Sequence, residues 1–88
     1  MEWRVVESRL LVRQIQRAPR EIQRRYIVWR NLVRQRGPYL PGGFRVHALH
    51  GDRKGQKSAW LNRQWRVIFK VCEGELVVEA IELTPHRY

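Results

Sequence analysis

The residue with the clearest chemical potential is Arg66, which lies in the middle of the alternating segment 64–71. Every second side chain there is large and apolar, so in a strand Arg66 must point away from the apolar face. A guanidinium among apolar neighbours suits a bound phosphate, because its planar fork of N–H donors matches two phosphate oxygens. The alternative is a structural role, in which Arg66 pairs across a sheet with Glu79 or Glu82.

A second set of reactive side chains stands in Pro85-His86-Arg87-Tyr88. An imidazole can move a proton near neutral pH, a guanidinium can stabilise a phosphorane, and a phenol can donate a hydrogen bond or stack on a base. Metal-free RNA cleavage needs these groups. The alternative is a frayed terminus, which is common for the last residues of a chain.

The segment Gly51-Asp52-Arg53-Lys54-Gly55-Gln56-Lys57 carries three cations within five residues. Its glycines allow the backbone to approach a ligand closely, and the cations can contact phosphates. The spacing is not that of a Walker phosphate-binding loop, which ends in Gly-Lys-Ser/Thr. The alternative interpretation is an exposed, charged hairpin turn.

The sequence offers little support for other kinds of active site. His47 and His50 are three residues apart, which would place them on opposite faces of a strand, and a single cysteine without an acidic cluster argues against zinc. Cys72 lies beside a turn without an evident histidine partner, and the motifs of serine nucleophiles and dinucleotide sites are absent. We therefore expect no metal and no cofactor.

The charge of the chain indicates a polyanionic partner. The net charge is +10, and residues 8–70 hold 16 of the 18 Lys and Arg residues but only two acidic ones, Glu21 and Asp52. A field this positive attracts nucleic acid or an acidic protein, although a merely solubilising surface is the alternative.

The length and composition predict one globular domain, 1–88, with one modest core. No apolar run approaches the roughly 20 residues that a bilayer span requires, and no apolar segment follows Met1 as in a secretory signal. The single cysteine fits a reducing compartment. We therefore expect a cytoplasmic protein without a membrane partner.

The elements that must position these side chains begin with a short strand, Trp3–Val6, and two helices. Ser8 is a suitable cap for a first helix that runs to about Arg17. Its apolar positions are Leu11, Val12, Ile15 and Ala18. Pro19 is well placed as the first residue of a second helix, which ends at Gly37-Pro38. The apolar stripe of that helix is Ile22, Tyr26, Trp29 and Val33.

From Arg45 onward the apolar period changes to two, which predicts β-structure. The candidate strands are Arg45–Leu49, Lys57–Leu61, Gln64–Val71 and Leu76–Leu83. Turn-forming residues separate them. An early strand, a two-helix hairpin and an antiparallel meander predict an α+β domain, in which the helices pack on a small, twisted, mainly antiparallel sheet.

Three stretches also carry a family resemblance. They are His47-Ala48-Leu49-His50-Gly51-Asp52-Arg53-Lys54-Gly55-Gln56-Lys57-Ser58, Leu61-Asn62-Arg63-Gln64-Trp65-Arg66-Val67-Ile68-Phe69 and the terminal Pro85-His86-Arg87-Tyr88. With them the chain from Val46 to Tyr88 resembles the RelE/ParE superfamily of bacterial toxins, and within it the HigB-like and RelE-like ribosome-dependent mRNA interferases. The N-terminal half matches only in its order of strand, helix and helix.

The resemblance implies a RelE-like fold that binds RNA on the concave face of its sheet. It implies cleavage of mRNA in the ribosomal A site, by attack of a 2′-hydroxyl on the adjacent phosphate and without a metal. It assigns Arg66 to the transition-state phosphate, His86 to acid or base catalysis, and Tyr88 to orienting or stacking on a base. Lys54 and Lys57 match the family's basic loop and strand. The further residues expected to bind RNA are Arg53, Trp60, Arg63, Lys70 and Arg87.

Trp60 is a departure from the family pattern, because many relatives carry Arg or Lys just before the Leu61-Asn62 position. Its indole could provide a stacking surface for a splayed base. The alternative is that Trp60 covers the helix layer.

The partners implied by the resemblance are a cognate antitoxin with an acidic contact segment, the ribosome and mRNA. Two other functions stay open. One is a non-enzymatic, ParE-like inhibitor of DNA gyrase, against which the terminal His86 and Tyr88 argue. The other is an RNA-binding relative that has lost catalysis, for which Trp60 is the best sign.

Overall fold

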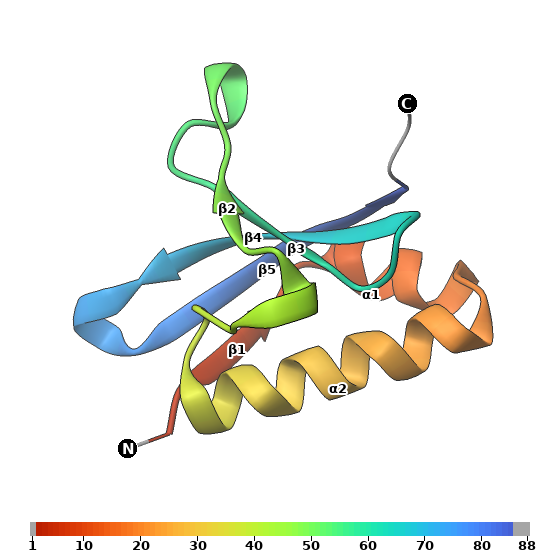
Figure 1. The fold of residues 1–88 in the computed structure, drawn as a ribbon, viewed down its shortest axis with the longest axis horizontal. Helices are drawn as coiled ribbons and strands as arrows, with labels where there is room; N and C mark the ends of the chain where they lie inside the picture. Colours follow the sequence, from red (N-terminus) through yellow and green to blue (C-terminus); the bar gives the residue numbers. More distant parts are fainter. Residues whose placement is uncertain (1, 86–88) are drawn as a thin grey trace.

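The computed structural model describes residues 2–85 and has two layers, with both helices on one side of a five-stranded sheet (Figure 1). In chain order the elements are β1 (Arg4–Glu7), α1 (Arg9–Arg17), α2 (Arg20–Arg36), β2 (His47–Ala48), β3 (Lys57–Trp60), β4 (Trp65–Cys72) and β5 (Val77–Pro85). Short 3₁₀ turns precede β2, β3 and β5. The predicted α+β class is confirmed.

The sheet has the strand order β1-β5-β4-β3-β2. β1 runs parallel to β5 and the other neighbours are antiparallel, so the predicted mainly antiparallel sheet is confirmed. The strand predicted over residues 45–49 is shorter than expected, since β2 contains only His47 and Ala48. Arg45 adopts a left-handed backbone with φ of 45°, which cannot continue a strand. The hairpin that joins β2 to β3 extends away from the helices (Figure 1).

The helix α1 begins as predicted, because the Ser8 Oγ accepts a hydrogen bond from the backbone N–H of Leu11 at 3.0 Å. This bond satisfies one of the donors that a helix N-terminus leaves free. Leu11 and Ala18 are buried and Ile15 is partly buried. Val12, which is also among the apolar positions of this helix, is 39% exposed. One position beyond Leu11, it is turned by about 100° around the helix axis.

The helix α2 carries the most regular pattern, and its four predicted core residues are all buried: Ile22, Tyr26, Trp29 and Val33. It begins at Arg20, and the carbonyl of Pro19 accepts the first helical hydrogen bonds. Its C-cap is Gly37, whose φ is 85°. A Cβ there would lie 2.9 Å from Trp3 Nε1, so glycine is required at this position. Within residues 2–85, neither helix combines the length and apolar character that crossing a membrane requires.

The side chains of β4 point alternately into the core and toward the opposite face of the sheet. Val67 and Phe69 are buried toward the helices, and the ring centroids of Phe69 and Trp29 are 5.5 Å apart. Because side chains alternate along a strand, Arg66 and Ile68 belong to the face turned away from the helices, which we call the outer face. Ile68 is only 4% exposed, so the outer face is partly covered rather than wholly open to solvent.

Candidate nucleic-acid interface

The position of Arg66 is set by the pairing of β4 with its two neighbours. Trp60 on β3 and Thr84 on β5 lie directly opposite Arg66 in the register. Residues opposite one another in antiparallel strands share a face, so the three side chains form a row across the outer face. The guanidinium carbon of Arg66 is 5.7 Å from the centroid of the Trp60 ring, which is within cation–π range.

The two acidic residues of β5, Glu79 and Glu82, do not lie opposite Arg66 in the register. Lys70 is paired with Glu79 in the register, and Glu82 is opposite Ile68 and forms an ion pair with Arg53. Neither Glu79 nor Glu82 is therefore directly opposite Arg66, and the alternative in which one of them is its cross-strand partner in the register is wrong. A bulge between Ile68 and Phe69 shifts the pairing along this part of the sheet.

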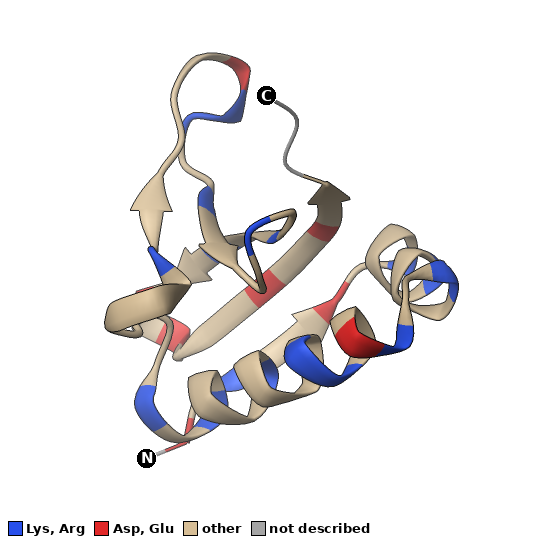
Figure 2. Cartoon of the chain, turned by 45° about the vertical axis from the view of Figure 1, so that its right-hand side comes forward, with Lys and Arg blue, Asp and Glu red and all other residues tan. Residues whose placement is uncertain are grey.

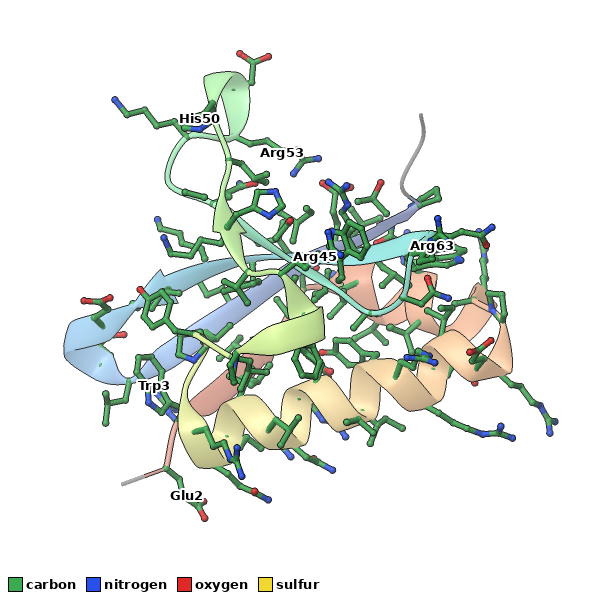
Figure 3. All side chains as sticks on the ribbon, in the orientation of Figure 1. Glu2, Trp3, Arg45, His50, Arg53 and Arg63 are labelled. Carbon is green, nitrogen blue, oxygen red and sulfur yellow. The ribbon has the colours of Figure 1, made fainter. Side chains whose placement is uncertain are left out.

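The basic loop between β2 and β3 reaches back to the sheet through Arg53. Its guanidinium binds Glu82 of β5 and donates a hydrogen bond to Gln56 Oε1 at 3.0 Å. Figure 3 shows Arg53 pointing from this raised loop toward the body of the molecule. Lys54 is exposed. The loop therefore holds one cation against the outer face and presents the next one to solvent.

Trp60 contacts a second cation besides Arg66. The guanidinium carbon of Arg45 lies 4.5 Å from the centroid of the Trp60 ring. Arg45 comes from the end of the 3₁₀ turn Gly42–Phe44, and its left-handed backbone costs about 1 kcal/mol or more for a residue other than glycine. Trp60 shares the face of Arg66 and is not part of the hydrophobic core, so the alternative that it covers the helix layer is wrong.

Three other cations predicted to bind RNA lie on β3, in the loop between β3 and β4, and on β4. Lys57 is opposite Phe69 in the register, and its Nζ lies 5.8 Å from the Tyr39 ring centroid, so it belongs to the other face from Arg66. Arg63 is exposed in the loop between β3 and β4. Lys70 belongs to the outer face, but it is four residues along β4 from Arg66, a span of about 13 Å in a strand.

Three predicted site residues, His86, Arg87 and Tyr88, lie outside the described residues. The last described residue, Pro85, is opposite Trp65 and therefore next to the row that contains Arg66.

The sequence did not single out His47 as a site residue, yet the register places it on the outer face opposite Ser58. Its Nδ1 lies 2.9 Å from the carbonyl oxygen of Arg45, and its Nε2 lies 3.4 Å from Ser58 Oγ. A carbonyl only accepts hydrogen bonds, so Nδ1 carries a proton and the neutral ring keeps its lone pair on Nε2. Only the strand pairing reveals this placement, because β2 is too short to show an alternating pattern.

The described part of the chain contains no group of three His, Cys, Asp or Glu side chains that could hold a metal ion. The argument that His47 and His50 lie on opposite faces of one strand does not apply, because β2 ends at Ala48. Partial burial and the neighbouring Glu79 carboxylate raise the pKa of the Cys72 thiol. A protonated thiol is a poor nucleophile, so Cys72 is not suited to covalent catalysis.

Charge is divided between the elements of the fold. Figure 2 shows Lys and Arg on both helices and on the β2–β3 hairpin, whereas β5 carries acidic residues. The outer face therefore combines the cations Arg45, Arg53 and Arg66 with the carboxylates of Glu79 and Glu82.

Comparisons with known proteins establish the fold family. A scan against protein-family models found no match, and neither did a search of the curated proteins. A chain of the archaeal RelE–RelB complex from Pyrococcus horikoshii matches with a TM-score of 0.81 and 27% identity, over 97% of this chain and 96% of that one. This chain belongs to the RelE/ParE-like superfamily.

Two further solved structures share the fold of this chain. YafQ from E. coli matches with a TM-score of 0.81 at 15% identity, over 97% of this chain and 94% of that one. The YoeB–YefM complex from Staphylococcus aureus contains a chain that matches with a TM-score of 0.74 at 13% identity, over 99% and 100% of the two chains. The RelE/ParE-like fold therefore includes the N-terminal strand and both helices, where the sequence resembled the superfamily only in element order.

Proposed function

We propose that this protein is the toxin of a type II toxin–antitoxin system and a ribosome-dependent, metal-independent endoribonuclease that cleaves mRNA in the A site. The observation that carries the proposal is the position of Arg66, half-buried on the outer face between Trp60 and Thr84. The similarity of the fold to RelE, YafQ and YoeB supports the toxin role.

In the proposed reaction, the RNA 2′-oxygen forms a bond to the adjacent phosphorus and the bond from phosphorus to the 5′-oxygen breaks. The products are a 2′,3′-cyclic phosphate and a 5′-hydroxyl. Arg66 donates hydrogen bonds to the non-bridging phosphate oxygens, where negative charge grows in the transition state. The Trp60 ring beside its guanidinium restricts its rotation, which aligns the donors before the reaction.

The proton transfers need a group that takes the 2′-hydroxyl proton and a group that protonates the leaving 5′-oxygen. We assign His86 to one of these steps. His47 is the second candidate, because its Nε2 lone pair lies on the outer face. Tyr88 is proposed to stack on or orient a base.

Binding of the RNA backbone is proposed for the remaining cations. These cations come from the loops, the outer face and the terminus: Arg53, Lys54, Arg63, Lys70 and Arg87. Each contact with a phosphate adds affinity that weakens as the salt concentration rises. Lys57 belongs to the other face of the sheet, so its contact would be with a different part of the RNA from the cleaved phosphate.

The proposed antitoxin contact is the helical surface. Several apolar side chains are exposed there: Leu10, Val12, Ile27 and Val28. Arginines surround them on both helices. A cognate antitoxin segment with acidic and apolar residues complements such a surface, since opposite charges set orientation and apolar area adds affinity.

The test is inducible expression in bacteria of the wild type, Arg66→Ala and Arg36→Ala, scored by growth and by mapping of mRNA ends. Arg36 is exposed in the last turn of α2 and is the matched control for loss of one positive charge. We expect growth arrest with new 5′-hydroxyl ends at codons for the wild type and Arg36→Ala, and neither effect for Arg66→Ala.

Two outcomes contradict the proposal. Growth arrest without new mRNA ends, accompanied by loss of DNA supercoiling activity, would identify a gyrase inhibitor. Unchanged growth with the wild type and retained RNA binding would identify an inactive RNA-binding relative.

A further inference from the structure

An open pocket of about 450 Å³ adjoins Trp60. Its walls come from α2, from the 3₁₀ turn before β2, and from the β3–β4 loop, which contribute Arg25, Phe44, Arg45 and Arg63 besides Trp60. Figure 3 labels Arg45 and Arg63, which come from segments far apart in the sequence. The volume is within the usual range for sites that bind small organic ligands, about 300–1,000 Å³.

The walls of this pocket, which we call the Trp60 pocket, combine aromatic surface with positive charge. Among residues 2–85, no acidic residue lines it. Arg25 is engaged already, since it binds Glu21 at 3.2 Å and donates to the carbonyl of Leu61 at 3.2 Å. Arg45 and Arg63 form no ion pair with an acidic residue within 2–85. The matching ligand is therefore an anion that also carries a flat ring.

The stacked pair of Arg45 and Trp60 is held in place before any ligand binds. The backbone of Arg45 is left-handed, its guanidinium lies over the indole, and its carbonyl oxygen lies 2.9 Å from His47 Nδ1. Nucleobases of single-stranded RNA stack on aromatic rings and on guanidinium planes. A preformed surface of both kinds lowers the ordering cost of binding.

We propose that the Trp60 pocket binds one nucleotide of a single-stranded RNA, with the base stacked on the Arg45–Trp60 pair and its phosphate held by Arg63. Trp60 also contacts Arg66, so this nucleotide is the neighbour of the one whose phosphate Arg66 binds. Its place along the cleaved strand rests on the proposed function. Arg45, Trp60 and Arg63 thereby hold the nucleotide beside the cut, by stacking on its base and binding its phosphate.

Binding is tested without ribosomes, by titrating the purified Arg66→Ala protein with 5′-nucleoside monophosphates, with ribose 5-phosphate and with inorganic phosphate. The readout is the NMR signal of the Trp60 indole N–H, identified as the one lost in Trp60→Phe. We expect saturable shifts with at least one nucleotide, and an affinity about tenfold higher than for the two ligands without a base, as base stacking implies. Equal affinity for inorganic phosphate and nucleotides, or no shift, overturns the proposal.

The variants Arg45→Ala and Arg63→Ala locate the site. Each is expected to weaken nucleotide binding roughly fivefold or more, whereas Arg36→Ala, at the far end of α2, leaves it unchanged. Arg63 is exposed, so its variant keeps the test informative should Arg45→Ala unfold, which circular dichroism reports. Equal weakening by Arg36→Ala contradicts a defined pocket.

Failure of this proposal and failure of the proposed function give different results. If the wild type produces no mRNA cuts but the Trp60 signal still responds to nucleotides, the nuclease proposal fails and the pocket stands. If cuts occur and depend on Arg66 but Arg45→Ala and Arg63→Ala cleave RNA with unchanged apparent affinity, the pocket proposal fails and the nuclease stands.

Discussion

Arg53, in the loop between β2 and β3, forms an ion pair with Glu82, which is 29 residues further along the chain in β5. The contact ties the basic loop to the outer face beside Ile68, the apolar residue opposite Glu82. The two side chains are 43% and 20% exposed, and ion pairs open to solvent to this degree contribute about 0–1 kcal/mol. A phosphate can therefore replace Glu82 as the partner of Arg53.

The variant Glu82→Gln is expected to bind single-stranded RNA about two- to fivefold more tightly, because it removes a carboxylate that competes for Arg53. Fluorescence anisotropy of a labelled oligonucleotide over a range of salt concentrations measures this. Glu75→Gln is the control, since it removes the same charge from an exposed position in the β4–β5 turn. Equal gains in both variants would attribute the effect to net charge instead of the ion pair.

Arg66→Ala and Lys54→Ala are expected to have different effects, because one residue is proposed for catalysis and the other for binding. Loss of Arg66 should slow cleavage by about two to three decades, or roughly 3–4 kcal/mol of transition-state stabilisation. Loss of Lys54 should weaken RNA binding and flatten its dependence on salt. Single-turnover cleavage on programmed ribosomes separates rate from affinity. The assignment of roles is wrong if both variants change the same quantity.

Truncation of Trp29 is expected to unfold a large part of the population. Its side chain is fully buried and packs against Tyr26 and Phe69, so Trp29→Ala should cost about 3–5 kcal/mol. Val28 is the next residue back on α2 but is 53% exposed, and Val28→Ala should cost less than about 0.5 kcal/mol. Urea unfolding followed by circular dichroism compares the two. Similar losses would mean that α2 does not pack as described.

The hydroxyl of Tyr26 creates a pH dependence of stability. It donates a hydrogen bond to Glu7 Oε2 at 2.5 Å, and Arg30 binds the same oxygen at 3.3 Å. Burial, and then the hydrogen bond to Glu7, raise the pKa of Tyr26 well above its usual value. A folded-state pKa above the unfolded one stabilises the fold at lower pH. The stabilisation is lost above about pH 10, by about 1.4 kcal/mol per pH unit.

The variant Tyr26→Phe should therefore be about 1 kcal/mol less stable at pH 7, through loss of the hydrogen bond, and lose less further stability between pH 10 and 11. Unfolding free energies from urea titrations across this pH range test the difference. Tyr39→Phe serves as the comparison: the hydrogen bond from Tyr39 to Glu73 also raises the pKa of Tyr39, but its side chain is 56% exposed, so we expect a smaller change in the pH slope. An identical pH slope in wild type and Tyr26→Phe would contradict the role of Tyr26.

Burial along the helices and the length of β2 show which features the sequence pattern predicted and which it did not. The stripe of α2 was predictable because helical spacing places residues three and four apart on one face, whatever lies beside the helix. Val12 is exposed although it is one of the apolar positions of α1, because it stands at the edge of that stripe, where the neighbouring elements decide exposure. β2 is shorter than predicted because Arg45 adopts a left-handed backbone, for which its side chain gives no local signal.

The amino-acid pattern was enough to predict two helices on a mainly antiparallel sheet and to place Arg66 on the face opposite the core. Both follow from the spacing of apolar residues, which is a local property of the chain. The neighbours of Arg66 followed only from the folded structure. Trp60, Thr84, the Arg45 stack and the pairing of Arg53 with Glu82 depend on strand register and on a bulge, and these arise from packing between distant segments.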